Sequence, residues 1–208
     1  MPMKTIAVFV SGNGTNLQAI MNAVVRGALK ARIALVVSDK KDAFALKRAR
    51  RAGISTLFLD PKDYRDRRAY DAAVLRHLKA QEVDLIVLAG FMRILSPSFV
   101  RAYRNRILNI HPALLPAFPG ERAIKDAFRY GVGVTGVTVH FVDEEVDHGP
   151  IIVQEPVRVL ATDTMESLEK KIHKVEHRIY PEAIKKVLSG GLILKGRRVL
   201  PASHPEKT

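Results

Sequence analysis

Short runs of consecutive apolar residues alternate with amphipathic segments along most of this chain. The apolar runs are typical of strands buried on both faces, and the amphipathic segments have the periodicity of helices that cover a core on one side. The expected strands are residues 5–10, 33–37, 56–59, 85–88, 107–111, 134–142 and 151–159. The expected helices are residues 15–26, 43–52, 66–80, 97–103 and 165–189. This alternation predicts an α/β fold, a Rossmann-like one with a mostly parallel, twisted sheet and helices on both faces.

The length of the chain, 208 residues, fits a single domain. We expect that domain over residues 1–190, followed by a basic tail of residues 191–208 with a weak hairpin around Gly196. A hydrophobic share of 47% and a charged share of 26% are those of a globular protein, which excludes an intrinsically disordered chain. Because cysteine is absent, disulfides and thiolate metal ligands are also excluded.

Apolar runs and net charge narrow the possible locations and partners. The longest apolar run, residues 85–92, is far shorter than the ~20 residues of a membrane span, and residues 6–10 are too short for a signal peptide. We therefore expect a cytoplasmic protein with no membrane partner. The net charge is +13, but the basic residues are scattered and tryptophan is absent. This favours a solvated basic surface that attracts anionic small substrates over a nucleic-acid partner.

Ligands of such folds bind beyond the carboxyl ends of the strands, so the residues that follow each strand are candidates. The first such loop, residues 11–16 (SGNGTN), lies between an expected strand and an expected helix. Its glycines let the backbone approach an anion, and the free N–H groups of the helix start favour phosphate. Three readings remain: a mononucleotide-like phosphate site, a dinucleotide site in which Asp39 contacts a ribose, and a tight turn without a ligand.

Asn109 and His111 end the expected strand 107–111. Because they are two positions apart, they project from the same face of the strand. A carboxamide and an imidazole there are costly to bury without partners. They form either a hydrogen-bonded pair that holds the following loop, or a pair that donates hydrogen bonds to a developing oxyanion.

Acidic and histidine side chains are concentrated in residues 140–150 (HFVDEEVDHGP). No His-Glu-x-x-His spacing occurs there, so we expect no metal site. The segment is either a solvated acidic loop or one in which a single acid, Asp147, turns inward to a histidine.

Residues 88–95 (LAGFMRIL) directly follow another expected strand. Gly90 permits close backbone approach, and the apolar side chains after it either complete the core or line a pocket for a flat ring. These apolar side chains are Phe91, Met92, Ile94 and Leu95.

Taken together, the four loops resemble those of the phosphoribosylglycinamide formyltransferase family, the folate-dependent enzymes of purine biosynthesis. The resemblance extends from about residue 6 to residue 188. It rests on the segments SGNGTNLQAI, LAGFMRILSPSFV, LNIHPALLPAFPG, VTGVTVHFVDEEVDHGPII and EHRIYP. The Asn-x-His pair with the Asp of Asp-x-Gly-Pro also marks the wider superfamily of folate formyltransferases, whereas the glycine-rich loop is more specific to this family.

The resemblance implies roles for the residues at matching positions. Asn109, His111 and Asp147 match the catalytic residues of the family. The residues that match substrate contacts are Gly14, Thr15 and Asn16, which hold a phosphate, and Glu176, which contacts a ribose. The residues that match folate contacts are Arg67, Met92, Arg93, Ile94, Leu95 and Asn109. Residues 121–130, which we expect to form a loop, are less diagnostic of the family.

The implied activity is transfer of the formyl group of 10-formyltetrahydrofolate to the amine of glycinamide ribonucleotide, with no metal. Protonated His111 and Asn109 would stabilise the oxyanion of a tetrahedral intermediate, and Asp147 would favour the imidazolium and help to move the proton. The alternative is formyltetrahydrofolate deformylase, in which water replaces the amine. Further rivals are a methionyl-tRNA formyltransferase, a nicotinamide dehydrogenase and a non-catalytic binding module. We expect two small-molecule partners and either a monomer or a homodimer.

Overall fold

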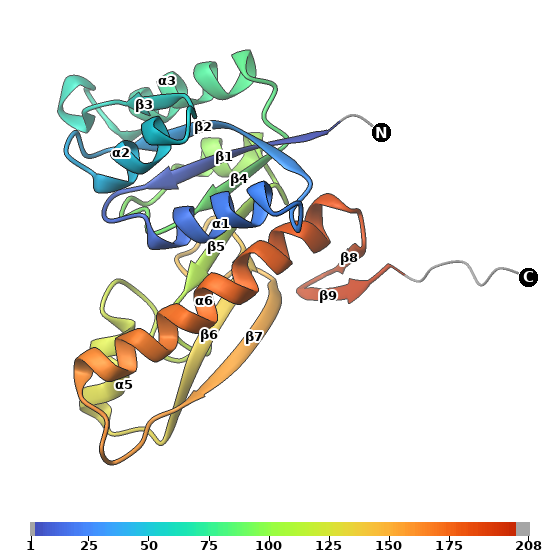
Figure 1. Ribbon diagram of the computed structural model, residues 1–208. Helices are drawn as coiled ribbons and strands as arrows, with labels where there is room; N and C mark the ends of the chain where they lie inside the picture. Colours follow the sequence, from blue (N-terminus) through green and yellow to red (C-terminus); the bar gives the residue numbers. More distant parts are fainter. Residues whose placement is uncertain (1–2, 203–208) are drawn as a thin grey trace, which may run out of the picture.

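A nine-stranded sheet organises residues 3–202, the part of the chain that the computed structural model describes (Figure 1). The strand order is β3-β2-β1-β4-β5-β6-β7-β9-β8. The strands are β1 (Lys4–Val10), β2 (Ala31–Ser38), β3 (Thr56–Phe58), β4 (Leu85–Leu88), β5 (Ile107–His111), β6 (Val134–Phe141), β7 (Ile151–Arg158), β8 (Leu192–Lys195) and β9 (Arg198–Pro201). Neighbouring strands from β3 to β5 are parallel, whereas the β5–β6, β6–β7 and β8–β9 pairs are antiparallel. The predicted α/β fold with a mostly parallel sheet is confirmed.

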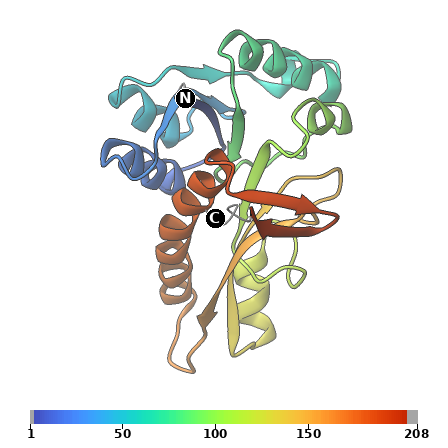
Figure 2. The same cartoon turned by 90° about the vertical axis from the view of Figure 1, so that its right-hand side faces the viewer.

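Helices cover both faces of this sheet. They are α1 (Thr15–Val25), α2 (Phe44–Arg51), α3 (Arg67–Ala80), α4 (Pro97–Ala102), α5 (Ala123–Tyr130) and α6 (Met165–Leu188), with a short 3-10 helix at Pro61–Asp63. The long helix α6 lies beside α1, and α3 lies away from both (Figures 1 and 2). Every expected strand and helix is present, and each begins and ends within two residues of its expected bounds.

Two hydrophobic cores, one on each face of the sheet, follow from the alternation of side chains along the strands. In β1, Ile6, Val8 and Val10 point into the core beneath α1, α2 and α6. Ala7 and Phe9 point into the core beneath α3 and α4. All five side chains are fully buried, which explains why the strand reads as an uninterrupted apolar run.

Helix α5 corrects our expectation of a loop over residues 121–130. It is only eight residues long, and the residue before it, Arg122, makes no side-chain hydrogen bond that caps the helix. The helix is held by tertiary packing, with Ala123 and Ala127 buried one turn apart. It ends at Gly131, whose φ of 81° is left-handed. These two alanines and this glycine were the available signal, but two buried positions are too few for a helical periodicity to stand out.

The turn expected around Gly196 joins β8 to β9, which form an antiparallel hairpin. The hairpin extends the same sheet, because Ile151 of β7 pairs with Arg198 of β9. Arg197 at the turn donates hydrogen bonds to His148, in the loop between β6 and β7. Residues 203–208 of the expected tail lie outside the described residues. Within residues 3–202, no helix has both the length and the apolar character needed to cross a membrane.

Candidate active site

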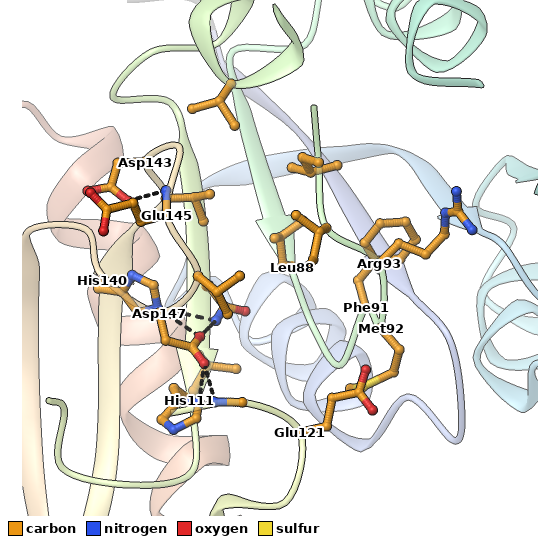
Figure 3. Close-up of a pocket in the computed structure, with 18 of the residues that line it drawn as sticks. Leu88, Phe91, Met92, Arg93, His111, Glu121, His140, Asp143, Glu145 and Asp147 are labelled. Carbon is orange, nitrogen blue, oxygen red and sulfur yellow. Dashed lines mark hydrogen bonds and ion pairs between the residues drawn. The ribbon is translucent and has the colours of Figure 1, made fainter. Parts of the chain in front are cut away.

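The chain leaves β1 toward β2 and β3 on one side and then crosses to β4 on the other. Such a switch in strand order opens a crevice beyond the carboxyl ends of the strands. A cavity of about 210 Å³ lies beyond β4 and β5 (Figure 3). It is lined by Leu88, residues 90–95, Val100, residues 109–112, Gly120, Glu121, His140 and residues 142–147. Three of the four loops that the sequence singled out therefore meet at one cavity.

Asn109 and His111 both line this cavity from β5, as strand alternation predicts. They are not bonded to each other. The Asn109 side-chain Nδ2 lies 3.2 Å from Nε2 of His140, its neighbour across the antiparallel β5–β6 pair. The Nε2 of His111 lies 2.8 Å from the carbonyl oxygen of Phe118 and so holds the loop that follows β5. Both side chains thus have partners that fix their orientation.

Asp147 turns inward between these side chains, with only 10% of its side chain exposed (Figure 3). Its Oδ2 lies 3.4 Å from Nδ1 of His111 and accepts a 2.7 Å hydrogen bond from the backbone N–H of Gly120. Its Oδ1 accepts a 3.4 Å hydrogen bond from Asn109 Nδ2 and lies 3.8 Å from Nε2 of His140. Of the two arrangements considered for this loop, the structure has the one with an inward acid.

The backbone around Asp147 explains how this loop returns over the sheet. Asp147 has a φ of 52°, a left-handed conformation that aspartate tolerates better than most residues. Two residues later, a Cβ on Gly149 would lie 1.8 Å from the carbonyl oxygen of Phe141. The N–H of Phe141 also donates a 2.9 Å hydrogen bond to the carbonyl of Pro150. The chain can fold back this tightly only because residue 149 has no side chain.

Two histidines beside Asp147 differ in their surroundings. Burial lowers the pKa of His140, so its neutral form is favoured. Its Nδ1 donates to the carbonyl of Phe141, which leaves Nε2 to accept from Asn109. His111 instead has an acceptor at each ring nitrogen, the Phe118 carbonyl and the Asp147 carboxylate. A ring with protons on both nitrogens would donate to both of these acceptors.

The other wall of the cavity is apolar and comes from the segment after β4. Met92 and Ile94 are 55% and 58% exposed and face the cavity, whereas Phe91 and Leu95 are buried and also pack in the core beneath α3 and α4. Exposed apolar side chains that line a cavity are available to a ligand. The segment therefore does both things that the sequence allowed: Phe91 and Leu95 complete the core, and Met92 and Ile94 line the pocket.

Of the two arginines expected to contact folate, Arg93 lines the cavity and Arg67 does not. The guanidinium of Arg93 lies over the ring of Tyr70, 4.7 Å from its centroid, and points away from the carboxylate of Asp147 (Figure 3). Arg67 begins α3 and is absent from the lining of the cavity. Arg67 and Arg93 both act electrostatically on the carboxylate of Asp71, but only Arg93 lines the cavity.

The glycine-rich loop leads into α1 without a side-chain cap. Gly14 is the N-cap residue, with a φ of 76°, and the first turn of the helix carries no acidic residue. The first N–H groups of α1 are therefore open to an anion. Asn16 Nδ2 donates a 3.1 Å hydrogen bond to Glu176 on α6, which joins two expected substrate contacts that are far apart in the sequence. Thr15 lines a neighbouring hollow with His177.

Glu176 is 4% exposed and has a second partner, Nδ1 of His173, at 2.8 Å. The hydrogen bond that this carboxylate accepts from His173 raises the pKa of the histidine. Asn16 Oδ1 and His177 Nε2, close to this pair, are buried without a hydrogen-bond partner. Buried polar atoms without a partner are candidates for contact with a polar ligand or an ordered water.

Several contacts at the site were not expected from the sequence. His140 orients Asn109, and the N–H of Gly120 binds Asp147. Asp39, considered as a ribose contact, instead accepts a 2.6 Å hydrogen bond from the Ser11 hydroxyl. Among residues 3–202, no three His, Asp or Glu side chains are grouped so as to hold a metal ion.

Comparisons with known proteins agree on one family. The family model described as "Formyl transferase" matches residues 4–184. A phosphoribosylglycinamide formyltransferase of Bacillus subtilis (strain 168) is 45% identical over 196 residues, which are 94% of this chain and 100% of that protein. A trifunctional purine biosynthetic protein adenosine-3 of Gallus gallus is 50% identical over 187 residues, or 90% of this chain, but the match covers only 19% of that protein.

Solved structures give the same result. The glycinamide ribonucleotide transformylase 1 of Symbiobacterium toebii has a TM-score of 0.94 and 51% identity, over 97% of this chain and 95% of that one. A formyltetrahydrofolate deformylase of Pseudomonas syringae has a TM-score of 0.88 but only 28% identity, and the match covers 96% of this chain and 66% of that one.

Proposed function

This chain belongs to the formyl transferase family, and we propose that it transfers the formyl group of 10-formyltetrahydrofolate to the amine of glycinamide ribonucleotide in purine biosynthesis. The main observation behind the proposal is that Asn109, His111 and Asp147 line one cavity, with Asp147 in contact with the other two, and that another wall of this cavity is apolar. The close similarity to full-length phosphoribosylglycinamide formyltransferases supports the same substrates.

The two substrates would approach from different sides of the catalytic residues. The folate would lie against the apolar wall that Met92 and Ile94 provide, since exposed apolar side chains suit a flat ring. The phosphate of the ribonucleotide would bind the open N–H groups at the start of α1, beside Thr15. Glu176, held by Asn16 and His173, would accept hydrogen bonds from the ribose hydroxyls.

The reaction forms a bond from the amine nitrogen to the formyl carbon and breaks the bond from that carbon to N10 of the folate. A tetrahedral intermediate with a negative oxygen lies between these steps, and His111 as an imidazolium would stabilise it. Asn109 already donates both amide hydrogens, to His140 and Asp147. The 3.4 Å bond to Asp147 is the longer and weaker one, so the hydrogen in that bond is the one that the oxyanion would accept in place of Asp147.

Asp147 would then do two things. Its Oδ2 lies 3.4 Å from His111 Nδ1, where it would accept a hydrogen bond from that nitrogen and so orient the ring toward the oxyanion. Released from Asn109, its Oδ1 can accept the proton that the amine loses and return it to N10, so that charge and protons balance over the reaction. None of these steps uses a covalent nucleophile on the protein.

The alternative reaction, hydrolysis by a deformylase, would use water in place of the amine. Its representative among the solved structures is much less similar in sequence than the transformylase of S. toebii. Nothing in the geometry of the site favours water over an amine.

The test is to incubate the purified protein with 10-formyltetrahydrofolate, with and without glycinamide ribonucleotide, in the presence of a metal chelator and without ATP. We expect formylated ribonucleotide, detected by mass spectrometry, only when both substrates are present. His111→Ala should lower kcat by about 10²–10³-fold, whereas His77→Ala, an exposed histidine on α3, should leave it unchanged. Release of formate without ribonucleotide, or loss of transfer with the chelator, would contradict the proposal.

A further inference from the structure

Ser11 is the residue directly after β1, between the glycine-rich loop and the segment that provides the apolar wall. Its hydroxyl donates a 2.6 Å hydrogen bond to Asp39 Oδ1 and accepts a 2.9 Å hydrogen bond from the backbone N–H of Met92. Its own N–H donates a 3.0 Å hydrogen bond to the carbonyl of Gly90. One residue is thus bonded to the ends of both strands that flank β1.

Each bond of this hydroxyl has a defined direction. A serine hydroxyl has one hydrogen to donate, and here it goes to Asp39, which follows β2 and is 6% exposed. The oxygen is then free to accept from the N–H of Met92. Because the buried carboxylate can only accept, it holds the hydroxyl in this orientation.

The bond to Met92 begins where the sheet ends. The backbone pairing of β1 with β4 continues through Ala89, whose N–H donates to the Phe9 carbonyl, and through Ser11 and Gly90. At the next position, the N–H of Met92 donates to the Ser11 side chain and not to a backbone carbonyl of the neighbouring strand. The backbone of Met92, which belongs to the exposed part of the apolar wall, is therefore placed by the Ser11 hydroxyl.

Ser11 also begins the loop that leads into α1. The next carbonyl, of Gly12, accepts a 3.1 Å hydrogen bond from the N–H of Ala45, and Arg48 donates hydrogen bonds to the backbone and side-chain oxygens of Asn13. A ligand that orders this loop also restrains Ser11. Restraint of Ser11 then restrains Met92, and the linkage acts equally in the other direction.

We propose that Ser11 is a positioning residue that couples the two substrate sites, so that the ribonucleotide and the folate bind with positive cooperativity. This rests on the proposed function, because it takes the loop and the apolar wall as the sites of the two substrates. Asp39 contributes to the coupling because it accepts the hydroxyl hydrogen and so leaves the Ser11 oxygen facing the N–H of Met92.

The coupling is measured by titrating glycinamide ribonucleotide calorimetrically into protein alone and into protein saturated with tetrahydrofolate, which carries no formyl group. We expect tetrahydrofolate to tighten ribonucleotide binding by about fivefold, the net worth of roughly one hydrogen bond. In Ser11→Ala and in Asp39→Ala, the ratio of the ribonucleotide Kd without tetrahydrofolate to the Kd with it should fall to about one. Asp39→Asn keeps an oxygen that accepts from the hydroxyl and should retain the coupling. Ser55→Ala, an exposed serine outside the network, is the matched control.

A second readout needs no ligand. The backbone amide of Met92 should exchange its hydrogen at least about fivefold faster in Ser11→Ala than in the wild type or in Ser55→Ala. A ratio near one in the wild type, or an unchanged ratio in both Ser11→Ala and Asp39→Ala, would overturn the coupling. Wild-type protein that binds neither compound would overturn the proposed function itself and the coupling with it.

Discussion

Replacement of Gly14 by alanine is expected to destabilise the protein and distort the glycine-rich loop, for two separable reasons. Gly14 has a φ of 76°, and the left-handed conformation costs a residue with a Cβ about 1–2 kcal/mol. The new Cβ would lie 2.5 Å from the Cβ and 2.9 Å from the Cα of Ala45 on α2, and such an overlap costs about 1–3 kcal/mol. Together these effects predict a loss of about 2–5 kcal/mol in the free energy of unfolding.

Two variants separate the backbone effect from the overlap. Gly12→Ala, in the same loop, meets no atom within 4 Å and should change stability by less than about 0.5 kcal/mol. Ala45→Gly removes the nearer of the two overlapping atoms at a cost of about 1 kcal/mol for a glycine in a helix. Combined with Gly14→Ala, it should restore part of the stability that the overlap costs, but none of the stability that the left-handed backbone costs. The double-mutant cycle should therefore give a favourable interaction of about 1–2 kcal/mol.

Urea unfolding of the wild type and the four variants gives these free energies, and calorimetry gives the consequence for binding. Gly14→Ala should weaken binding of glycinamide ribonucleotide, since the loop must move away from Ala45, and leave binding of tetrahydrofolate nearly intact. Equal stability of Gly14→Ala and Gly12→Ala, or additive effects of Gly14→Ala and Ala45→Gly, would refute the steric argument. Equal loss of both ligands would show that the loop supports the fold and not the phosphate.

Three further predictions concern other parts of the protein. His111→Ala and Asp147→Asn should each lower kcat by about 10²–10³-fold with little change in binding, and the double variant should lose little more, because residues that act as a unit are non-additive; losses that multiply in steady-state kinetics would disprove this. The raised pKa of His173 stabilises the folded state fully below about pH 6.5, and this contribution is lost as the pH rises through the raised pKa; the stability difference between wild type and His173→Gln, measured by urea unfolding, should therefore shrink with rising pH. The buried hydroxyl of Tyr180 donates to two strand carbonyls, so Tyr180→Phe should cost about 1–3 kcal/mol, whereas Tyr130→Phe on the surface should not change the unfolding midpoint.

Short-range patterns in the sequence determined the secondary structure and part of the site. The apolar runs placed β1 and β4, because strands buried on both faces have few polar positions to interrupt them. The two-residue spacing put Asn109 and His111 at one cavity, because successive side chains of a strand alternate between its faces. The resemblance to formyltransferases, read from the motifs alone, led to the same family as the comparisons.

Only the tertiary structure decided which distant residues meet. Asp147 reaches His111 because β6 runs antiparallel to β5 and the loop after it folds back through Gly149. Asp39 accepts a hydrogen bond from Ser11, and Arg67 is not among the residues that line the cavity. Helix α5 forms through packing, without a cap. The physical reason is common to all four: a local period determines which face a side chain occupies, whereas its partners depend on strand order and on how closely loops pack, which no short window of sequence contains.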